Sequence, residues 1–329
     1  MRTRLMLTIS IATLGLAGAF VPVSAQGADS GRYPVRPIRV VIGFTPGGTP
    51  DITSRLIGTQ LSQSLGQPIV VDNRPGAGGT IGARLVAESE PDGYTLLSAS
   101  SSHVLQPSIY AKLPYNTTRD FAGITRTSTA CYMLVTSPAS ETRTAKDLVA
   151  QAKSKPGQLN FASAGNGSGT HFAAEMFRHA AGIDATHIPY KGIPESLNDT
   201  MAGRVQFFMS PLSGAIPLVK AGRLRALGVT CAKRVASIPE VPTLTETALP
   251  GFSYGTWSGM LAPAKTPRAI VNRLHDEIVR ILALPEISQK MHSLGVAPDP
   301  MTPAEFDKMI VEQVTQTAKL ARAAGIQPR

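Results

Sequence analysis

The sequence predicts a two-lobed α/β protein in which each lobe is a mostly parallel sheet flanked by helices, and crossing strands join the lobes. Short β-like runs alternate with helix-like runs over most of the 329 residues, a pattern typical of parallel sheets. The chain is too long for one compact core of ordinary size. The alternation also occurs as two successive series, which indicates one series in each lobe.

The first segment, residues 1–25, has the composition of a signal peptide. Arg2 and Arg4 precede an uncharged apolar stretch over 5–20, and small residues at 23–25 (VSA) supply a cleavage site. We therefore expect a mature protein that begins near Gln26 and resides in the periplasm. A retained membrane anchor is the alternative, but the stretch is shorter than the ~20 apolar residues that span a bilayer.

The first series of elements has the order of a βαβαβ unit, which implies parallel strands. Its first helix is indicated by Ile57, Leu61 and Leu65, which recur every fourth residue on one face. Glycine-rich and Pro-Asp-Gly turns separate the later elements. The expected order is strand 39–44, helix 52–65, strand 68–73, helix 81–89 and strand 94–98.

The second series repeats this logic. We expect strands at 131–136, 159–163, 186–190, 205–209 and 223–230, with helices at 145–154, 170–182, 195–203 and 215–222 between them. A further strand over 254–263 and two amphipathic helices, 267–294 (interrupted at Pro285) and 303–324, complete the chain. The predicted division is lobe 1 over 26–126 plus 234–329 and lobe 2 over 127–233.

Composition and charge exclude several classes of function. The net charge is +10, or +8 for the expected mature chain, and the excess is spread along the sequence. Nucleic-acid binding needs a basic run or stripe with interleaved aromatic residues, and neither is present. Cys131 and Cys231 could form a disulfide or remain two buried thiols, and their spacing does not decide between these. Without a Cys-X-X-Cys motif, structural zinc is not expected.

Two loops are the strongest candidates for a binding site. Residues 43–51 (GFTPGGTPD) and 163–170 (SAGNGSGT) each lie between a predicted strand and a helix start. Helix starts present unpaired N–H groups that favour anions, and glycines let a backbone approach a ligand closely. The alternative is that both are tight turns with capping residues. Residues 98–103 (SASSSH) add hydroxyl groups at the same edge of the predicted sheet.

Other motifs fail on inspection. The run 75–82 (PGAGGTIG) departs from the dinucleotide fingerprint by one residue and follows the second strand of its unit, so no nucleotide cofactor is expected. Neither Ser168 nor Ser258 has the flanking glycines of a nucleophile elbow. His171, His179 and His187 recur every eight residues, ~12 Å apart if all were helical, which is too far for one metal.

Several runs together resemble one protein family: YPVRPIRVVIGFTPGGTPD, VVDNRPGAGGTIGA, PDGYTLL, LNFASAGNGSGTHFAAEMF, HIPYKG and VKAGRLRALGVT. In this order they are similar to the Bug-type (TctC-like) solute receptors of tripartite tricarboxylate transporters. The resemblance covers essentially the whole mature chain. It implies a type II-like periplasmic binding protein that closes its lobes on a small carboxylate, held by backbone amides and hydroxyls of the two loops.

The resemblance also implies a set of ligand-binding residues, which come from both lobes. Asp51 is expected to organise the helix start. The strand end at Ser210 holds an aspartate in many relatives, so its absence favours a plain or aromatic carboxylate over an amino acid. The implied residues are Phe44, Pro46, Gly47, Gly48, Asp51, Ser98, Ser101, Ser102, Ala164, Gly165, Ser168, Thr170 and Ser210.

These observations predict a monomeric receptor, not an enzyme, that needs no cofactor or metal. It would bind a small organic carboxylate and deliver it to membrane transporter subunits, without contacting nucleic acid. Two alternatives remain open. One is a ligand sensor that acts on a membrane signalling partner. The other is a secreted serine hydrolase that uses Ser168 or Ser102 with His103 or His171, which would need those groups within hydrogen-bond reach.

Overall fold

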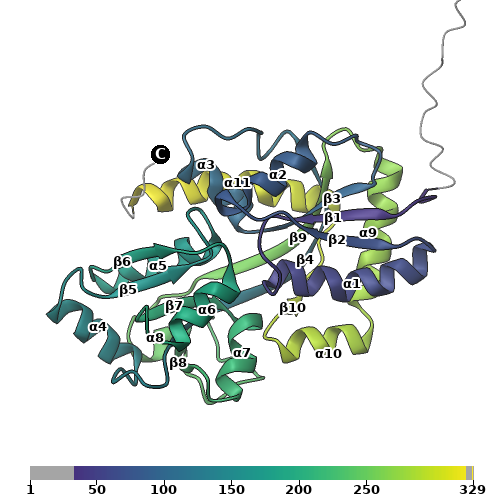
Figure 1. Cartoon of the computed structure of the whole chain (residues 1–329). Helices are drawn as coiled ribbons and strands as arrows, with labels where there is room; N and C mark the ends of the chain where they lie inside the picture. Colours follow the sequence, from purple (N-terminus) through teal and green to yellow (C-terminus); the bar gives the residue numbers. More distant parts are fainter. Residues whose placement is uncertain (1–32, 324–327, 329) are drawn as a thin grey trace, which may run out of the picture.

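A computed structural model of the protein describes residues 33–323 and residue 328 (Figure 1). The predicted signal peptide lies outside the described residues. The strands form one continuous sheet in the order β2-β1-β3-β9-β4-β7-β5-β6, with β8 and β10 each paired to β4. Figure 1 shows two groups of helices at the two ends of this sheet, so the predicted two-lobed α/β architecture is confirmed.

Lobe 1 is built on a parallel sheet of β1, β2 and β3, as the βαβαβ order predicted. Helix α1 begins after Gly48 with Pro50 in its first turn and ends at Gly66, whose φ of 67° is left-handed. Its strands are β1 (Ile38–Ile42), β2 (Ile69–Asn73), β3 (Thr95–Ser100) and the short β10 (Ala297–Pro298). Its helices are α1 (Thr49–Leu65), η1 (Ala77–Gly79), α2 (Thr80–Ala87), α3 (Ser102–Ile109), α9 (Arg268–Leu282), α10 (Pro285–Ser293) and α11 (Pro303–Ala323).

Lobe 2 has a parallel set of β5, β6 and β7, with β8 antiparallel to β4. Helix α4 begins in a capping box, in which Thr144 and Asp147 satisfy each other's backbone N–H groups. The strands are β5 (Asn160–Ser163), β6 (Thr186–Pro189), β7 (Phe207–Pro211) and β8 (Arg225–Val229). The helices are α4 (Ala145–Ser154), α5 (Gly169–Ala181), α6 (Ile193–Met201), α7 (Leu212–Lys220) and α8 (Leu244–Thr247).

Two long antiparallel strands, β4 (Phe121–Thr136) and β9 (Gly255–Pro263), connect the lobes. They pair from Phe121 with Pro263 to Cys131 with Gly255, and β9 also pairs with β3 in lobe 1. Beyond this region, β4 continues into lobe 2, where it pairs with β7 and β8. The crossing strands therefore form a shared floor under the space between the lobes.

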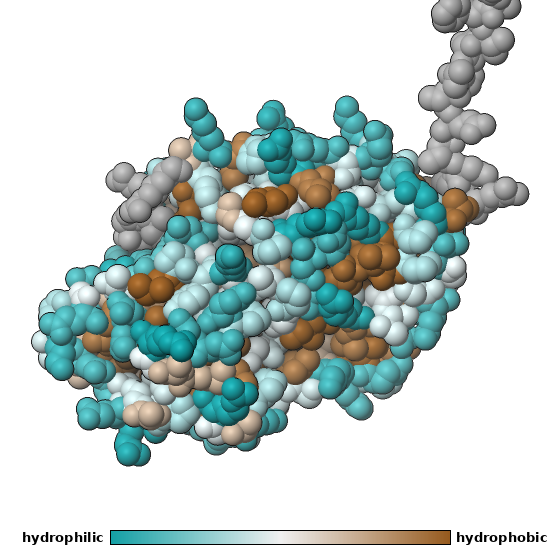
Figure 2. All heavy atoms as spheres, in the orientation of Figure 1, coloured by the Kyte–Doolittle hydropathy of each residue, from teal (hydrophilic) through white to brown (hydrophobic). Residues whose placement is uncertain are grey.

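Each lobe has apolar cores on both faces of its sheet. In lobe 1, Ile57 and Leu61 of α1 pack with α9 and α10 on one face, while α2 and α11 cover the other. In lobe 2, α4 and α5 pack around Phe161, and α6 and α7 cover the opposite face. Polar side chains cover most of the face seen in Figure 2. Within the described residues, no helix is long and apolar enough to cross a membrane.

Residues 234–254 pack with lobe 2. Ile238 and Val241 belong to the core under α6 and α7, and Leu244 and Leu249 pack with the Phe161 core. After residue 254, the chain returns to the core of lobe 1 along β9. We therefore propose that lobe 2 extends to about residue 254 and not to 233, because a lobe is defined by its own hydrophobic core.

Cys131 and Cys231 form a disulfide, with Cα atoms 5.4 Å apart. Of the two possibilities that the sequence leaves open, pairing is therefore the one adopted. Cys131 lies on the crossing strand β4, and Cys231 follows β8 shortly after its end. The bond closes a loop over a sequence separation of 100 residues, which contains most of lobe 2.

Candidate ligand site between the lobes

Helix α1 starts at the cleft edge of lobe 1, directly after β1 and its loop. The Asp51 carboxylate accepts the N–H of Gly47 at 3.0 Å and forms an ion pair with Arg55 at 2.9 Å. These contacts fix the turn that precedes the helix. They also use the Gly47 amide, so that the buried start of α1 at Gly48 and Thr49 lies against lobe 2, where Thr49 bonds to Ser213.

Helix α5 starts in the matching position of lobe 2, after β5. The Ser168 hydroxyl caps the helix by accepting the N–H of His171 at 3.2 Å. The Thr170 hydroxyl accepts the N–H of Ala164 at 2.9 Å and lies 3.0 Å from the Ser168 oxygen. The loop is therefore held in one conformation by its own hydroxyl groups.

Both helix starts retain backbone donors that the protein does not use. Among the described residues, the N–H groups of Thr49, Gly169 and Thr170 donate no hydrogen bond. Unpaired N–H groups and the helix dipole together give each helix start about half a positive charge. Two such starts from opposite lobes make a site for an anion without any ionised side chain.

An inner chamber of about 40 Å³ lies between these helix starts. The crossing strands form its floor through Tyr132 of β4 and Thr256 and Ser258 of β9. Hydroxyl-bearing and apolar residues line it, and no charged side chain does. The lining consists of Phe44, Gly48, Thr49, Pro50, Ser100, Tyr132, Ala164, Ser168, Gly169, Thr170, Ile193, Pro211, Thr256 and Ser258.

Tyr132 connects the floor to both lobes. Its hydroxyl is buried and bonds with the hydroxyls of Ser101 and Thr256, which are 2.7 Å from each other. Burial raises the pKa of Tyr132, so its hydroxyl stays neutral at physiological pH. A Cβ at Gly169 would collide with this hydroxyl, and glycine is therefore required where α5 begins.

A larger outer chamber, of about 620 Å³, lies on the other side of Phe44 and Ala164, which line both spaces. Lobe 1 contributes the glycine-rich segment 75–79 and Tyr110, and lobe 2 contributes residues 164–166, Tyr190 and Lys191. The Tyr110 hydroxyl donates to the Asn166 carbonyl at 2.9 Å, which brings the lobes together at one rim. A Cβ at Gly78, where φ is 61°, would overlap that same carbonyl.

Comparison with known proteins identifies the family. The model for the tripartite tricarboxylate transporter family receptor matches residues 53–326, which is most of the chain. This chain belongs to that receptor family. Receptors of this family are periplasmic solute-binding proteins, which agrees with the resemblance found in the sequence.

Curated relatives and solved structures cover nearly the whole receptor. The protein BugT of Bordetella pertussis is 34% identical over 325 residues, covering 98% of each chain. A Pseudomonas protein from the tcbD-tcbE intergenic region is 39% identical over 283 residues, covering 86% of this chain and 84% of that one. The periplasmic binding protein BugD has 30% identity and a TM-score of 0.87, covering 90% of this chain and 100% of its own.

Two solved relatives contain carboxylates. A Rhodopseudomonas palustris protein with adipate is 31% identical, with a TM-score of 0.87 and coverage of 90% of this chain and 100% of that chain. MatC from the same species, with bound malate, is 28% identical, with a TM-score of 0.83 and coverage of 87% and 99%.

Six residues that the sequence suggested line the chambers of the receptor. Phe44 and Ala164 line both, Gly165 lines the outer one, and Gly48, Ser168 and Thr170 line the inner one. Whether they contact ligand stays a prediction. The signal that found them was the position of two loops after two predicted parallel strands.

The other suggested residues line neither chamber. Pro46 is exposed, and Ser98 and Ser102 line a small neighbouring cavity of about 10 Å³. Ser210 is buried and donates to the Pro211 carbonyl at 3.1 Å. The Gly47 N–H donates to the Asp51 carboxylate, and the Ser101 hydroxyl bonds with the hydroxyls of Tyr132 and Thr256.

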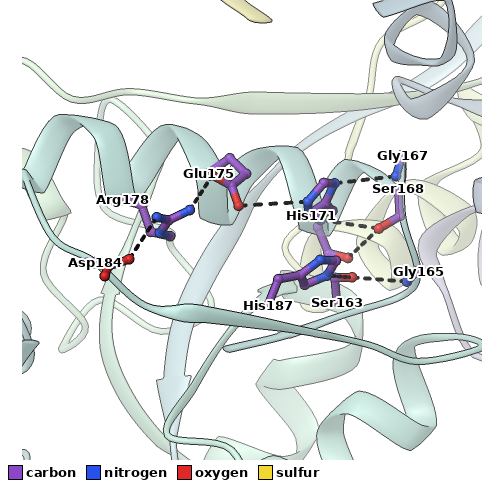
Figure 3. Close-up of polar contacts among 10 residues, drawn as sticks. Ser163, Gly165, Gly167, Ser168, His171, Glu175, Arg178, Asp184 and His187 are labelled. Atoms are coloured by element: carbon purple, nitrogen blue, oxygen red, sulfur yellow. Dashed lines mark hydrogen bonds and ion pairs between the residues drawn. The ribbon is translucent and has the colours of Figure 1, made fainter. Parts of the chain in front are cut away.

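A histidine pair supports the lobe 2 loop (Figure 3). The rings of His171 and His187 stack with centroids 4.1 Å apart, so the prediction from helical spacing, which would place these two residues ~24 Å apart, is wrong for this pair. Helix α5 ends before His187, and β6 folds back beside it. His187 Nε2 lies 2.5 Å from the Ser163 hydroxyl oxygen, which accepts the Gly165 N–H, and the Gly167 N–H donates to His171 Nδ1.

Proposed function

We propose that this receptor captures a small organic carboxylate in the inner chamber and presents it, in the closed state, to tripartite-type membrane transporter subunits. The observation that carries the proposal is the convergence of the α1 and α5 starts, with the unused N–H groups of Thr49, Gly169 and Thr170. Donors fixed by the fold cost little reorganisation when an anion binds.

The chemistry of the lining favours a carboxylate over an amino acid. No acidic side chain lines the inner chamber, so a ligand ammonium group would find no counter-charge there. The hydroxyls of Ser100, Thr170 and Thr256 can complete the hydrogen bonding of two carboxylate oxygens. The presence of adipate and malate in two structural relatives supports the same class of ligand.

Closure follows from the position of the ligand. Groups from both lobes surround the inner chamber, so a bound carboxylate gains its full set of contacts only when the lobes are together. The same closed surface would identify a loaded receptor to its membrane partner. A monomer is sufficient for this role, and export into the periplasm with removal of the signal peptide is part of the proposal.

The test is thermal unfolding of the purified protein against mono-, di- and tricarboxylates, with the primary amide of each acid as its control. A ligand at 100 times its Kd adds about 2.7 kcal/mol to the unfolding free energy, which raises the midpoint measurably. We expect a rise with at least one acid and none with its amide. Equal responses to acid and amide, or no response to any acid, would contradict the proposal.

A further inference from the structure

The outer chamber has a lining of a different kind from that of the inner one. Aromatic and apolar groups dominate it, including Phe44, Pro75, Ala77, Tyr110 and Tyr190. The backbone of residues 76–79 adds a wall without large side chains. Such a chamber is suited to the body of a ligand and not to its carboxylate.

The hydroxyls of the two chamber tyrosines are already bonded. Tyr110 donates to the Asn166 carbonyl, and Tyr190 donates to the Asp199 carboxylate at 2.6 Å. Their rings are therefore the surfaces available to a ligand. Together with Phe44, they place three aromatic groups from both lobes around one space.

Lys191 is the only charged side chain in this lining. Within the described residues it forms no ion pair, although two acidic residues of α6 follow it in sequence. Those acids have other partners. Glu195 accepts from the Thr45 hydroxyl at 3.4 Å, and Asp199 bonds to Tyr190 and Arg204. Lys191 is exposed, so the outer chamber has one positive charge at its solvent-facing edge, without an ion-pair partner among the described residues.

The two chambers meet at Phe44 and Ala164. A ligand whose carboxylate lies between the α1 and α5 starts must extend past Phe44 to reach the outer space. The inner chamber, at about 40 Å³, has room for little beyond the carboxylate itself. The rest of the ligand therefore lies against the aromatic lining.

We propose that the outer chamber binds an aromatic ring attached to the captured carboxylate, and that Lys191 contacts a second acidic group on the far side of that ring. This inference rests on the proposed function and specifies its ligand class as an aromatic acid, with a diacid preferred. Phe44 contacts the ring in a stacked or edge-to-face geometry, which contributes binding energy beyond that of the buried apolar area.

The segment 75–79 gains a role in this account. Its glycines resemble part of a dinucleotide fingerprint, but they face the ligand space and lobe 2. A side chain at Gly79 would press on the Phe44 ring, since a Cβ there would lie 3.1 Å from Phe44 Cε2. The glycines keep Phe44 in place and keep the chamber wide enough for a flat ring.

Calorimetric titration of the purified protein with four acids tests the inference. Benzoate and benzene-1,4-dicarboxylate supply the ring with one or two acidic groups, while hexanoate and adipate are aliphatic counterparts. We expect each aromatic acid to bind at least about fivefold more tightly than its aliphatic counterpart, and the aromatic diacid to bind most tightly.

Variants of Lys191 separate the two parts of the inference. Lys191→Gln is expected to weaken binding of benzene-1,4-dicarboxylate about threefold to fivefold and to leave benzoate unchanged, because only the diacid has a second charge. Lys191→Arg should restore the diacid affinity. Lys220→Gln, on the exposed end of α7 and outside both chambers, is the matched control.

The outcomes distinguish this inference from the proposed function. Binding of all four acids without an aromatic preference, or an equal effect of Lys191→Gln on benzoate and the diacid, would overturn the inference and leave the function intact. Failure of the aromatic acids alongside binding of the aliphatic ones would also overturn it. Failure of all four, with no response in the wider acid panel, would overturn both.

Discussion

The side-chain oxygens of Thr49 and Ser213 lie 2.8 Å apart, although 164 residues separate them in the chain. Thr49 is the first residue of α1 in lobe 1, and Ser213 lies in the first turn of α7 in lobe 2. Thr49 also lines the inner chamber, whereas Ser213 does not. The hydrogen bond therefore joins the two lobes beside the site, and separation of the lobes would break it.

Removal of this bond should weaken ligand binding without changing the site. We expect Ser213→Ala to raise the Kd of the bound acid by about twofold to tenfold, since a hydrogen bond contributes about 0.5–1.5 kcal/mol. Titration calorimetry measures the change. Ser154→Ala, at the exposed end of α4, is the control and should leave the Kd unaltered. An unchanged Kd in Ser213→Ala would show that this bond does not contribute to closure.

Ser168 has two roles that separate measurements can resolve. Ser168→Ala removes the cap of α5, so we expect the unfolding free energy to fall by about 1 kcal/mol in ligand-free protein. It also removes a hydroxyl from the inner chamber lining, so affinity should fall as well. Thr144→Ala, the cap of α4, should lower stability similarly but preserve affinity. Equal affinity losses in the two variants would argue against a ligand contact at Ser168.

The disulfide should stabilise lobe 2. Replacement of both Cys131 and Cys231 by serine is expected to lower the unfolding free energy by about 2–5 kcal/mol, because a long loop is no longer closed in the unfolded chain. Urea unfolding of the variant and of the reduced wild-type protein measures this. Both should unfold at a lower urea concentration than the oxidised wild-type protein. Midpoints equal to that of the oxidised protein would contradict the prediction.

Two histidines make stability depend on pH. Burial lowers the pKa of His103 from 6.5 to about 4, and burial, with His171 and Arg178 nearby, lowers that of His187 to about 3. Both bind protons more readily in the unfolded chain, so their contribution to stability is complete above pH 6.5 and is lost as the pH falls toward 4 and 3.

We therefore expect the melting temperature to fall as the pH is lowered from about 6.5 to about 4, followed by differential scanning calorimetry. His103→Phe should flatten the profile, because it removes a buried ring whose Nε2 has no hydrogen-bond partner and keeps contacts with Tyr115 and Phe121. A profile of unchanged steepness in this variant would exclude His103 as a source of the pH dependence.

Local patterns were sufficient to predict most of the fold. The fourth-residue spacing of Ile57, Leu61 and Leu65 correctly gave the buried face of α1, and Pro285 correctly marked the break between α9 and α10. The length of β4 was missed, because only 131–136 has a strand-like composition. The preceding ten residues are extended because they pair with β9, more than a hundred positions away.

The site was only partly predictable for the same reason. The loops at Gly48 and Ser168 follow predicted strands, so topology alone placed them at the cleft. Tyr132 lies inside a strand and has no local signature of a binding residue. The glycine-rich segment lies against lobe 2 at Gly78, where the backbone approaches the Asn166 carbonyl too closely for a Cβ. No sequence pattern near residue 78 indicates this contact.

The most direct test is a crystal structure of the receptor with the tightest-binding acid from the panel. We predict that one carboxylate lies between the starts of α1 and α5, with its oxygens ~3 Å from the N–H groups of Thr49 and of Gly169 or Thr170. A ligand that binds outside the inner chamber, or one whose carboxylate contacts neither helix start, would contradict the proposal that this protein is a carboxylate receptor of the kind described.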